Sequence, residues 1–112
     1  MSRVLLSRQL TLEAVERVAD GAGGYAETWQ ALGLVWAEVT ARSGRERDGG
    51  DVTLSTTRYR IILRAAPVGQ SSRPVPGMRF REGNRVFTVL AVAEHDAAGR
   101  YLRCETTEEV VV

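Results

Sequence analysis

The stretch MRFREGNRVFTVLAVAEHDAAGRYLRCE, residues 78–105, decides the fold because it contains three short strands separated by two tight turns. The segments 78–81, 85–94 and 100–112 have the composition and short length of strands, with alternation clearest around Cys104. Gly83-Asn84 favours a two-residue hairpin turn, and Asp96 to Gly99 suits a type I turn closed by a left-handed glycine. The second half of the chain is therefore predicted to be an antiparallel meander. Its EEVVV tail is either a last strand or a disordered end that orders on a partner.

Three further strands are predicted upstream of this meander. Residues 58–66 alternate, with Tyr59, Ile61, Leu63 and Ala65 on one face. Residues 34–42 alternate in the same way and are entered through Gly33, which marks a bulge or bend. Residues 3–14 alternate except at Leu5 and Arg8. A helix that begins near Thr11 is the alternative for the end of this run, because LEAVERVAD contains good helix formers.

The connections between these strands contain the glycines and prolines. The DGAGG run, residues 20–24, predicts a sharp turn in which Asp20 and the glycines adopt left-handed conformations. Residues 43–57 are polar and predict a long flexible connection. All three prolines lie between residues 67 and 77, and VPGM fits a type II turn. This pattern of strands and turns is typical of a small antiparallel barrel or sandwich. The prediction is an all-β fold: one domain over residues 1–112, a small antiparallel β-barrel of about six strands with long glycine-rich loops.

Composition restricts the function and the compartment. The 112 residues carry a net charge of +1, so the whole molecule has no electrostatic drive toward nucleic acid or membrane. All basic residues are arginine, which is typical of a GC-rich genome. The single Cys104 excludes an intramolecular disulfide and is interpreted as a small apolar residue in a strand. No segment resembles a signal peptide or a membrane span, so we expect an intracellular protein.

No catalytic or cofactor motif is evident, and the chain is predicted not to be an enzyme and to need no cofactor or metal. The DGAGG run lacks the spacing of a phosphate-binding loop, and no lysine follows it. A serine triad would have to use His95, the only histidine, without a nucleophile elbow. His95 precedes a turn and is expected to be solvated. The acidic residues show no metal-binding spacing.

An ordered set of short motifs resembles the phage head–tail joining family, the head-closure or stopper proteins of long-tailed phages. It begins with Leu10–Leu12, an Asp-Gly turn at Asp20–Gly24, and Trp29. The remaining motifs are Trp36-Ala37-Glu38, Ser43-Gly44-Arg45-Glu46, Tyr59–Arg64, Gly77–Phe80, Gly83 and Phe87–Val92. The match covers nearly the whole chain in order, although the Asp48–Thr57 segment and the EEVVV tail depart from the pattern.

The resemblance implies a structural protein of the virion neck, assembled in the bacterial cytoplasm. Such proteins form a ring, typically of twelve copies, below the adaptor ring on the portal and above the tail-completion or tail-terminator protein. The ring surrounds the channel for double-stranded DNA and helps to retain the packaged genome. The arginine-only composition also fits a prophage or a phage-derived gene transfer agent. No membrane partner is expected.

The gating role below follows from the resemblance, and the contact roles follow from the pattern of turns and strands. The alternatives are a solvated loop for residues 42–51 and a solvated sheet face for the arginines of residues 58–64. The candidate gating loop that points into the channel comprises Arg42, Arg45, Glu46, Arg47, Asp48, Gly49, Gly50 and Asp51. The candidate contacts between subunits or rings are Asp20, Gly23, Gly24, Tyr25, Trp29, Trp36, Arg58, Arg60 and Arg64. Trp36 is expected to cover a second apolar surface or to meet a neighbour, and Trp29 to anchor the turn to the barrel.

Two other functions stay open at this point. An OB-like barrel that binds single-stranded nucleic acid would need aromatic side chains beside a positive groove, and only Tyr59 and Phe80 have arginines close on both sides. A tail-terminator ring protein would differ only in its position along the particle.

Overall fold

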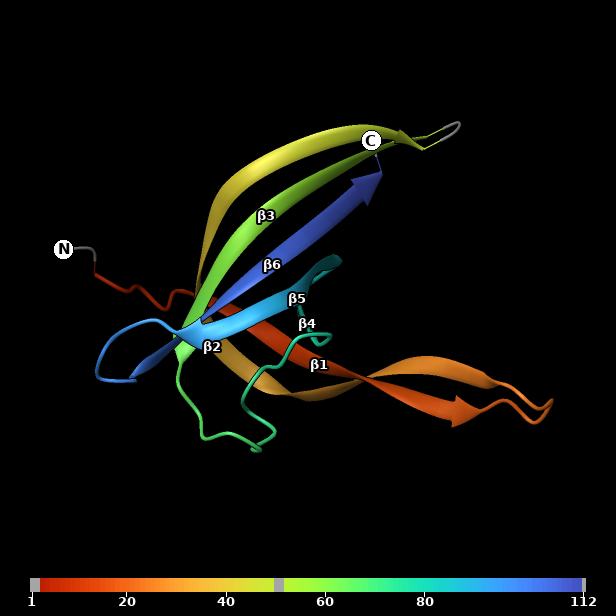
Figure 1. Ribbon diagram of the computed structural model, residues 1–112, viewed down its shortest axis with the longest axis horizontal. Coiled ribbons are helices and arrows are strands. Elements are labelled where there is room, and N and C mark those ends of the chain that lie inside the picture. Colours follow the sequence, from red (N-terminus) through yellow and green to blue (C-terminus); the bar gives the residue numbers. More distant parts are fainter. Residues whose placement is uncertain (1–2, 50–51, 112) are drawn as a thin grey trace.

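The computed structural model describes residues 3–49 and 52–111, which form six antiparallel strands (Figure 1). The strands close into a barrel in the order β1-β2-β3-β6-β5-β4. Their bounds are β1 Arg8–Ala19, β2 Tyr25–Gly49, β3 Val52–Arg64, β4 Arg79–Glu82, β5 Arg85–Glu94 and β6 Tyr101–Val111. The predicted all-β barrel of about six strands is therefore confirmed.

The meander predicted from residues 78–105 forms β4, β5 and β6. Glu82 pairs with Arg85 across the two-residue turn, and Gly83 adopts a φ of 61°. The amide of Gly99 donates to the carbonyl of Asp96 at 3.0 Å, with φ of 66° at Gly99, as the sequence predicted. β6 continues to Val111, so the tail is the end of a strand. Closure comes from β4, which pairs with β1 at Thr11, Leu12 and Glu13.

The core fills the barrel with inward-facing side chains from all six strands. Phe80 of β4 and Phe87 of β5 are directly paired and both fully buried. The other members of the core are Leu10, Leu12, Ala37, Ile61, Leu63, Val89, Leu102 and Cys104. Burial of Phe80 places its ring in the core, where it cannot stack on a base. One of the two aromatic residues that the nucleic-acid alternative relied on is therefore not exposed.

The first strand differs from its predicted bounds. β1 begins at Arg8 and continues to Ala19, so the helix alternative near Thr11 is wrong. LEAVERVAD is extended because it pairs residue by residue with β2, from Glu13 opposite Ala31 to Ala19 opposite Tyr25. Tertiary pairing has overridden the local helix propensity of this segment.

The predicted long connection over residues 43–57 is also wrong. β2 continues to Gly49, β3 begins at Val52, and the two strands pair from Ser43 opposite Arg58 to Gly49 opposite Val52. β6 adds a third strand beside this hairpin, from Thr57 opposite Glu108 to Leu54 opposite Val111. Glycine and charge in residues 43–51 suggested a loop, but the threonine and valine residues that follow are good strand formers.

Two projections leave the barrel because β2 is much longer than a barrel strand needs to be. The first is the end of the β1–β2 hairpin, residues 14–31, which we call the arm. The second is the β2–β3 hairpin with the end of β6. β2 bends sharply between them, so both point to the same side of Figure 1.

Candidate assembly surfaces

The turn at the tip of the arm is organised by Asp20. Its Oδ1 accepts hydrogen bonds from the amides of Ala22 at 2.8 Å and Gly24 at 3.1 Å. These two hydrogen bonds lower the pKa of the Asp20 carboxyl. Gly21 and Gly23 have positive φ, but Asp20 and Gly24 do not, so the left-handed prediction holds for two of the glycines only. A Cβ at Gly24 would lie 2.9 Å from Oδ2 of Asp20, so a larger residue there would displace the Asp20 side chain.

A β-bulge places the predicted aromatic contact residues on one face. Leu12 pairs with Gly33, but Glu13 pairs with Ala31, so β2 has one extra residue at this point. Trp36 and Leu34 therefore lie on the same outer face of the β1–β2 ribbon as Trp29 and Tyr25. All four side chains are exposed, from 37% for Trp29 to 64% for Tyr25 and Leu34.

A buried carboxylate lies at the base of the arm on this outer face. Glu13 is only 3% exposed and is bound by two arginines of β4. Nε of Arg79 lies 2.6 Å from Oε1, and Nη2 of Arg81 lies 3.1 Å from Oε2. The guanidinium of Arg79 also lies over the ring of Trp29, 4.0 Å from its centroid. The side chains of Trp29, Arg79 and Glu13 thus connect the arm to the barrel, and their cation–π and charged contacts are strongest where water is excluded.

The three arginines predicted as contacts lie on the outer face of β3, and Arg64 lines the same surface groove as Leu34 and Trp36. Arg58 and Arg64 are exposed, and Arg60 is half-buried. Nε of Arg60 has no hydrogen-bond partner within the described part of the chain. Ile62 lies between these arginines and is only 3% exposed, with Glu38 and Arg103 as its cross-strand neighbours. The face is therefore partly covered, and the structure does not bring these arginines together with the aromatic residues of the arm.

The candidate gating residues belong to the β2–β3 hairpin. Arg42 is exposed at the bulge between Ala41 and Ser43, and Arg45 to Gly49 lie in the paired part of β2. Gly50 and Asp51 lie outside the described residues. The segment is therefore a paired extension of the sheet for most of its length.

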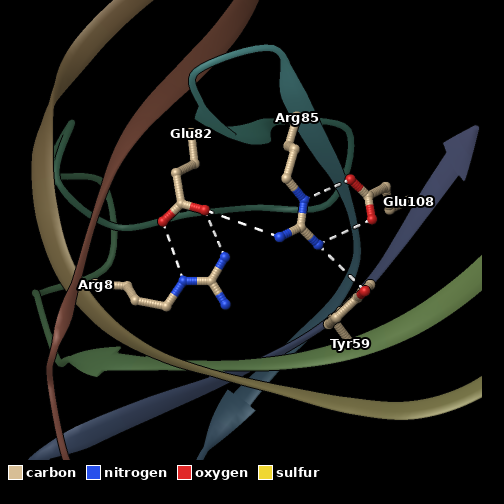
Figure 2. A network of polar contacts seen from close by, with 5 residues as sticks. All are labelled: Arg8, Tyr59, Glu82, Arg85 and Glu108. Carbon is tan, nitrogen blue, oxygen red and sulfur yellow. Dashed lines mark hydrogen bonds and ion pairs between the residues drawn. The ribbon is translucent and has the colours of Figure 1, made fainter.

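A partly buried network of five side chains was not predicted from the sequence (Figure 2). It joins five of the six strands through Arg8, Tyr59, Glu82, Arg85 and Glu108. Nε of Arg85 donates to Oε2 of Glu108 at 2.8 Å, and Nη2 donates to Oε1 at 3.0 Å and to the Tyr59 hydroxyl at 3.2 Å. Two nitrogens of Arg8 bind Glu82 in the same bidentate way, the Nε at 3.0 Å.

The network consists of two arginine–carboxylate pairs, Arg8–Glu82 and Arg85–Glu108. The hydrogen bond from Arg8 lowers the pKa of the Glu82 carboxyl, and the hydrogen bonds to Glu108 raise the pKa of Arg85. Bidentate pairs fix the relative orientation of the groups that they join. We infer that this network fixes the position of β6 relative to β1, β4 and β5. One signal was present in the sequence, because Arg8 occupies an inward position in an otherwise apolar alternation.

An apolar groove lies beside Trp36, at the other end of the ribbon from the tip of the arm. It has a volume of about 270 Å³. Its lining residues are Leu6, Leu34, Val35, Trp36, Leu63, Arg64, Ala65, Ala66 and Ser72. Arg64 is the one charged residue of this lining. Nη1 of Arg73 donates to the carbonyl of Ala66 at 3.0 Å, which places a second guanidinium at the edge of the groove.

Comparison with known proteins agrees with this architecture. The sequence profile described as phage head completion protein matches residues 1–109. The chain belongs to the phage head completion protein family. A chain from a structure titled "Virion of native gene transfer agent (GTA) particle" is 56% identical, with a TM-score of 0.86 and full coverage of both chains. A comparison with curated proteins gave no match.

Two potentially reactive side chains of this head completion protein, those of Cys104 and His95, are at least partly buried. Cys104 is buried in β6, and burial raises the pKa of its thiol to about 12. His95 is half-buried, where solvent exposure was expected, and its Nδ1 is buried without a hydrogen-bond partner among residues 3–49 and 52–111. The described residues contain no cluster of three acidic, histidine or cysteine side chains able to hold a metal ion. The same residues include no helix with the length and apolarity to cross a membrane.

Proposed function

We propose that this head completion protein is a non-enzymatic virion component that closes the DNA-filled head and joins it to the tail. The observation that carries the proposal is the family match over residues 1–109, together with 56% identity to a chain from a gene transfer agent particle. In this proposal residues 1–112 act as one joining domain. Copies form a ring, typically of twelve, in the neck, with the portal adaptor ring above and the tail-completion or tail-terminator protein below.

The exposed surfaces support a protein that works by contact. Tyr25, Leu34 and Trp36 are each more than half exposed on one face of the ribbon. Exposed apolar residues that gather on one face are typical of interaction sites. The same chain offers separate surfaces on the arm, the outer face of β3 and the β2–β3 hairpin, as a subunit with several neighbours requires.

Removing the gene tests the proposal. We expect particles without this protein to be heads without attached tails, with part of their DNA lost. Electron microscopy of purified particles and nuclease-resistant DNA per particle measure both effects, and complementation with the intact gene is the control. Normally tailed particles would contradict the proposed function. A map that locates the chain next to the tail tube, away from the head, would favour a tail-terminator position instead.

The β2–β3 hairpin, which contains Arg42 and Arg45 to Asp51, is proposed to reach into the DNA channel as a gate. Its paired structure permits a clean shortening, because Arg47 pairs with Leu54 and Asp48 pairs with Thr53. Deleting these four residues removes two adjacent pairs and preserves the alternation of faces along both strands. We expect the shortened protein to fold and assemble but to retain less nuclease-resistant DNA in heads that lack tails.

A variant of unchanged length is the matched control for the hairpin. Arg45→Gln with Arg47→Gln removes charge but no backbone, and we expect DNA retention closer to that of the parent. Unchanged retention and gene delivery by the shortened protein would contradict the gating role while leaving the head-completion role intact.

A further inference from the structure

The arm lacks the partners that normally stabilise a two-stranded ribbon. β4 pairs with β1 only at Thr11, Leu12 and Glu13, and β3 pairs with β2 only from Ala37 onward. Both edges of the arm are therefore unpaired among the described strands. Val15, Val18 and Tyr25 are 43%, 45% and 64% exposed. A two-stranded hairpin alone is marginal in water, and long free edges invite pairing or cover by another surface. The arm is built to be covered by a partner.

The groove beside Trp36 has the properties of a receptor for protein side chains. Its volume of about 270 Å³ lies at or below the range of roughly 300–1,000 Å³ typical of small-molecule sites. Leu34 and Trp36 on its wall are 64% and 55% exposed, although apolar. The described residues that line it include an arginine and no carboxylate. Such a groove suits one or two aromatic or aliphatic side chains that arrive with acidic neighbours.

The arm and the groove are complementary in charge. The arm carries Glu16, Asp20 and Glu27 against the single base Arg17, a net charge of −2. The groove has Arg64 on its wall and Arg73 at its edge. Opposite potentials on two surfaces favour their encounter and fix their register.

The arm cannot reach the groove of its own chain. Tyr25 and Trp36 are separated by eleven residues of the same strand, roughly 35 Å of extended chain. Pairing with β1 is continuous from Arg8 to Ala19, apart from one bulge, so the arm is held in the extended direction. An arm that enters this groove must therefore come from another copy.

We propose that the arm of one copy seats Tyr25 in the Leu34–Trp36 groove of a second copy, with Glu27 close to Arg64. The two surfaces differ, so the contact is head-to-tail and repeats from copy to copy until a ring closes. This inference rests on the proposed ring and names the surfaces that build it. The guanidinium of Arg17 lies 4.7 Å from the centroid of the Tyr25 ring. Seating of Tyr25 therefore places Arg17 at the rim of the groove.

Disulfide trapping in assembled particles tests this contact. Cys104 is buried, so cysteines introduced at exposed positions are the reactive ones. We expect Glu27→Cys with Arg64→Cys in the same chain, which keeps Tyr25, to give multimers larger than dimers on a non-reducing gel after mild oxidation. Glu27→Cys with Thr88→Cys is the matched control, because Thr88 is exposed on β5 outside the groove. Cross-linking of the control pair but not of the first pair would overturn the proposal, as would dimers only.

A charge exchange tests the same contact without cysteines. We expect Glu27→Arg and Arg64→Glu each to reduce the fraction of tailed particles, and the two together to restore it. Glu16→Arg is the control, since Glu16 lies on the opposite face of the arm, and Arg64→Glu should not rescue it. Thermal unfolding of each purified variant verifies folding. Failure of the pair to restore tailing overturns the proposed contact.

The two proposals fail in different ways. Tail-less particles on gene removal, with no trapped multimers and no charge rescue, would leave head completion standing and remove the arm contact. Trapped multimers with normally tailed particles on gene removal would remove the proposed function and leave the contact between copies.

Discussion

Phe87→Ala is expected to lower the free energy of unfolding by about 4 kcal/mol, within the range for deleting a buried aromatic side chain. Phe87 is fully buried, pairs with Phe80 across β4 and β5, and contacts Tyr59 edge-to-face at 5.1 Å between ring centroids. Because β4 is only four residues long, this pair is the main apolar contact that holds the closing strand. Urea unfolding monitored by circular dichroism measures the loss, which at about 4 °C per kcal/mol corresponds to a melting temperature about 16 °C lower.

Thr88→Ala is the control for this core prediction. Thr88 is the next residue of β5 and its side chain is exposed, so the change should stay within about 0.5 kcal/mol of the parent. Phe87→Leu fills most of the space and should lose about 1.5 kcal/mol or less. A larger loss for Thr88→Ala than for Phe87→Ala would contradict the assigned face of β5.

The order of turns was sufficient to predict the antiparallel meander, and the family resemblance favoured a barrel over a sandwich. Gly83-Asn84 and Asp96 to Gly99 impose local geometry that does not depend on distant residues, so the meander was predictable. The ends of β1 and β2 could not be predicted from the sequence, because their extended conformation depends on pairing between residues as far apart as Arg8 and Ala37. The same holds for residues 43–57, where pairing with β2 and β6 organises a segment of loop-like composition.

The candidate contact surface was predicted in part. Tyr25, Trp29 and Trp36 were identified individually, but their common face depends on the bulge opposite Glu13, whose register the sequence does not specify. Glu13 itself looked like an ordinary outward residue of an alternating strand. Its burial is decided by Arg79 and Arg81, which lie more than sixty residues away. Closure of the barrel brings together charged residues that are this far apart in the sequence, and the local sequence pattern does not reveal them.

Arg85→Met is expected to destabilise the protein by about 3 kcal/mol because it leaves the Glu108 carboxylate without its cation. The Glu108 side chain is only 10% exposed, whereas that of Arg85 is 41% exposed. Because Arg85 is partly exposed, the expected loss of stability lies at the lower end of the range for breaking a buried ion pair. Thermal and urea unfolding at neutral pH measure it. Arg103→Met is the control, since the Arg103–Glu105 pair is half-exposed on both sides and its loss should cost about 1 kcal/mol or less.

The double variant Arg85→Met/Glu108→Met tests whether the Arg85–Glu108 pair adds net stability or only offsets the cost of burying the Glu108 carboxylate. With both charges replaced by apolar side chains, no buried carboxylate is left, and we expect the double variant to be more stable than Arg85→Met alone. If β6 keeps its position in the double variant, the network contributes little beyond offsetting the cost of burying its own charges. If it folds but no longer completes heads, the network has a directional role: it fixes the end of β6 beside the β2–β3 hairpin, where Leu54 pairs with Val111. Equal stability of the single and double variants would contradict the view that Glu108 depends on Arg85.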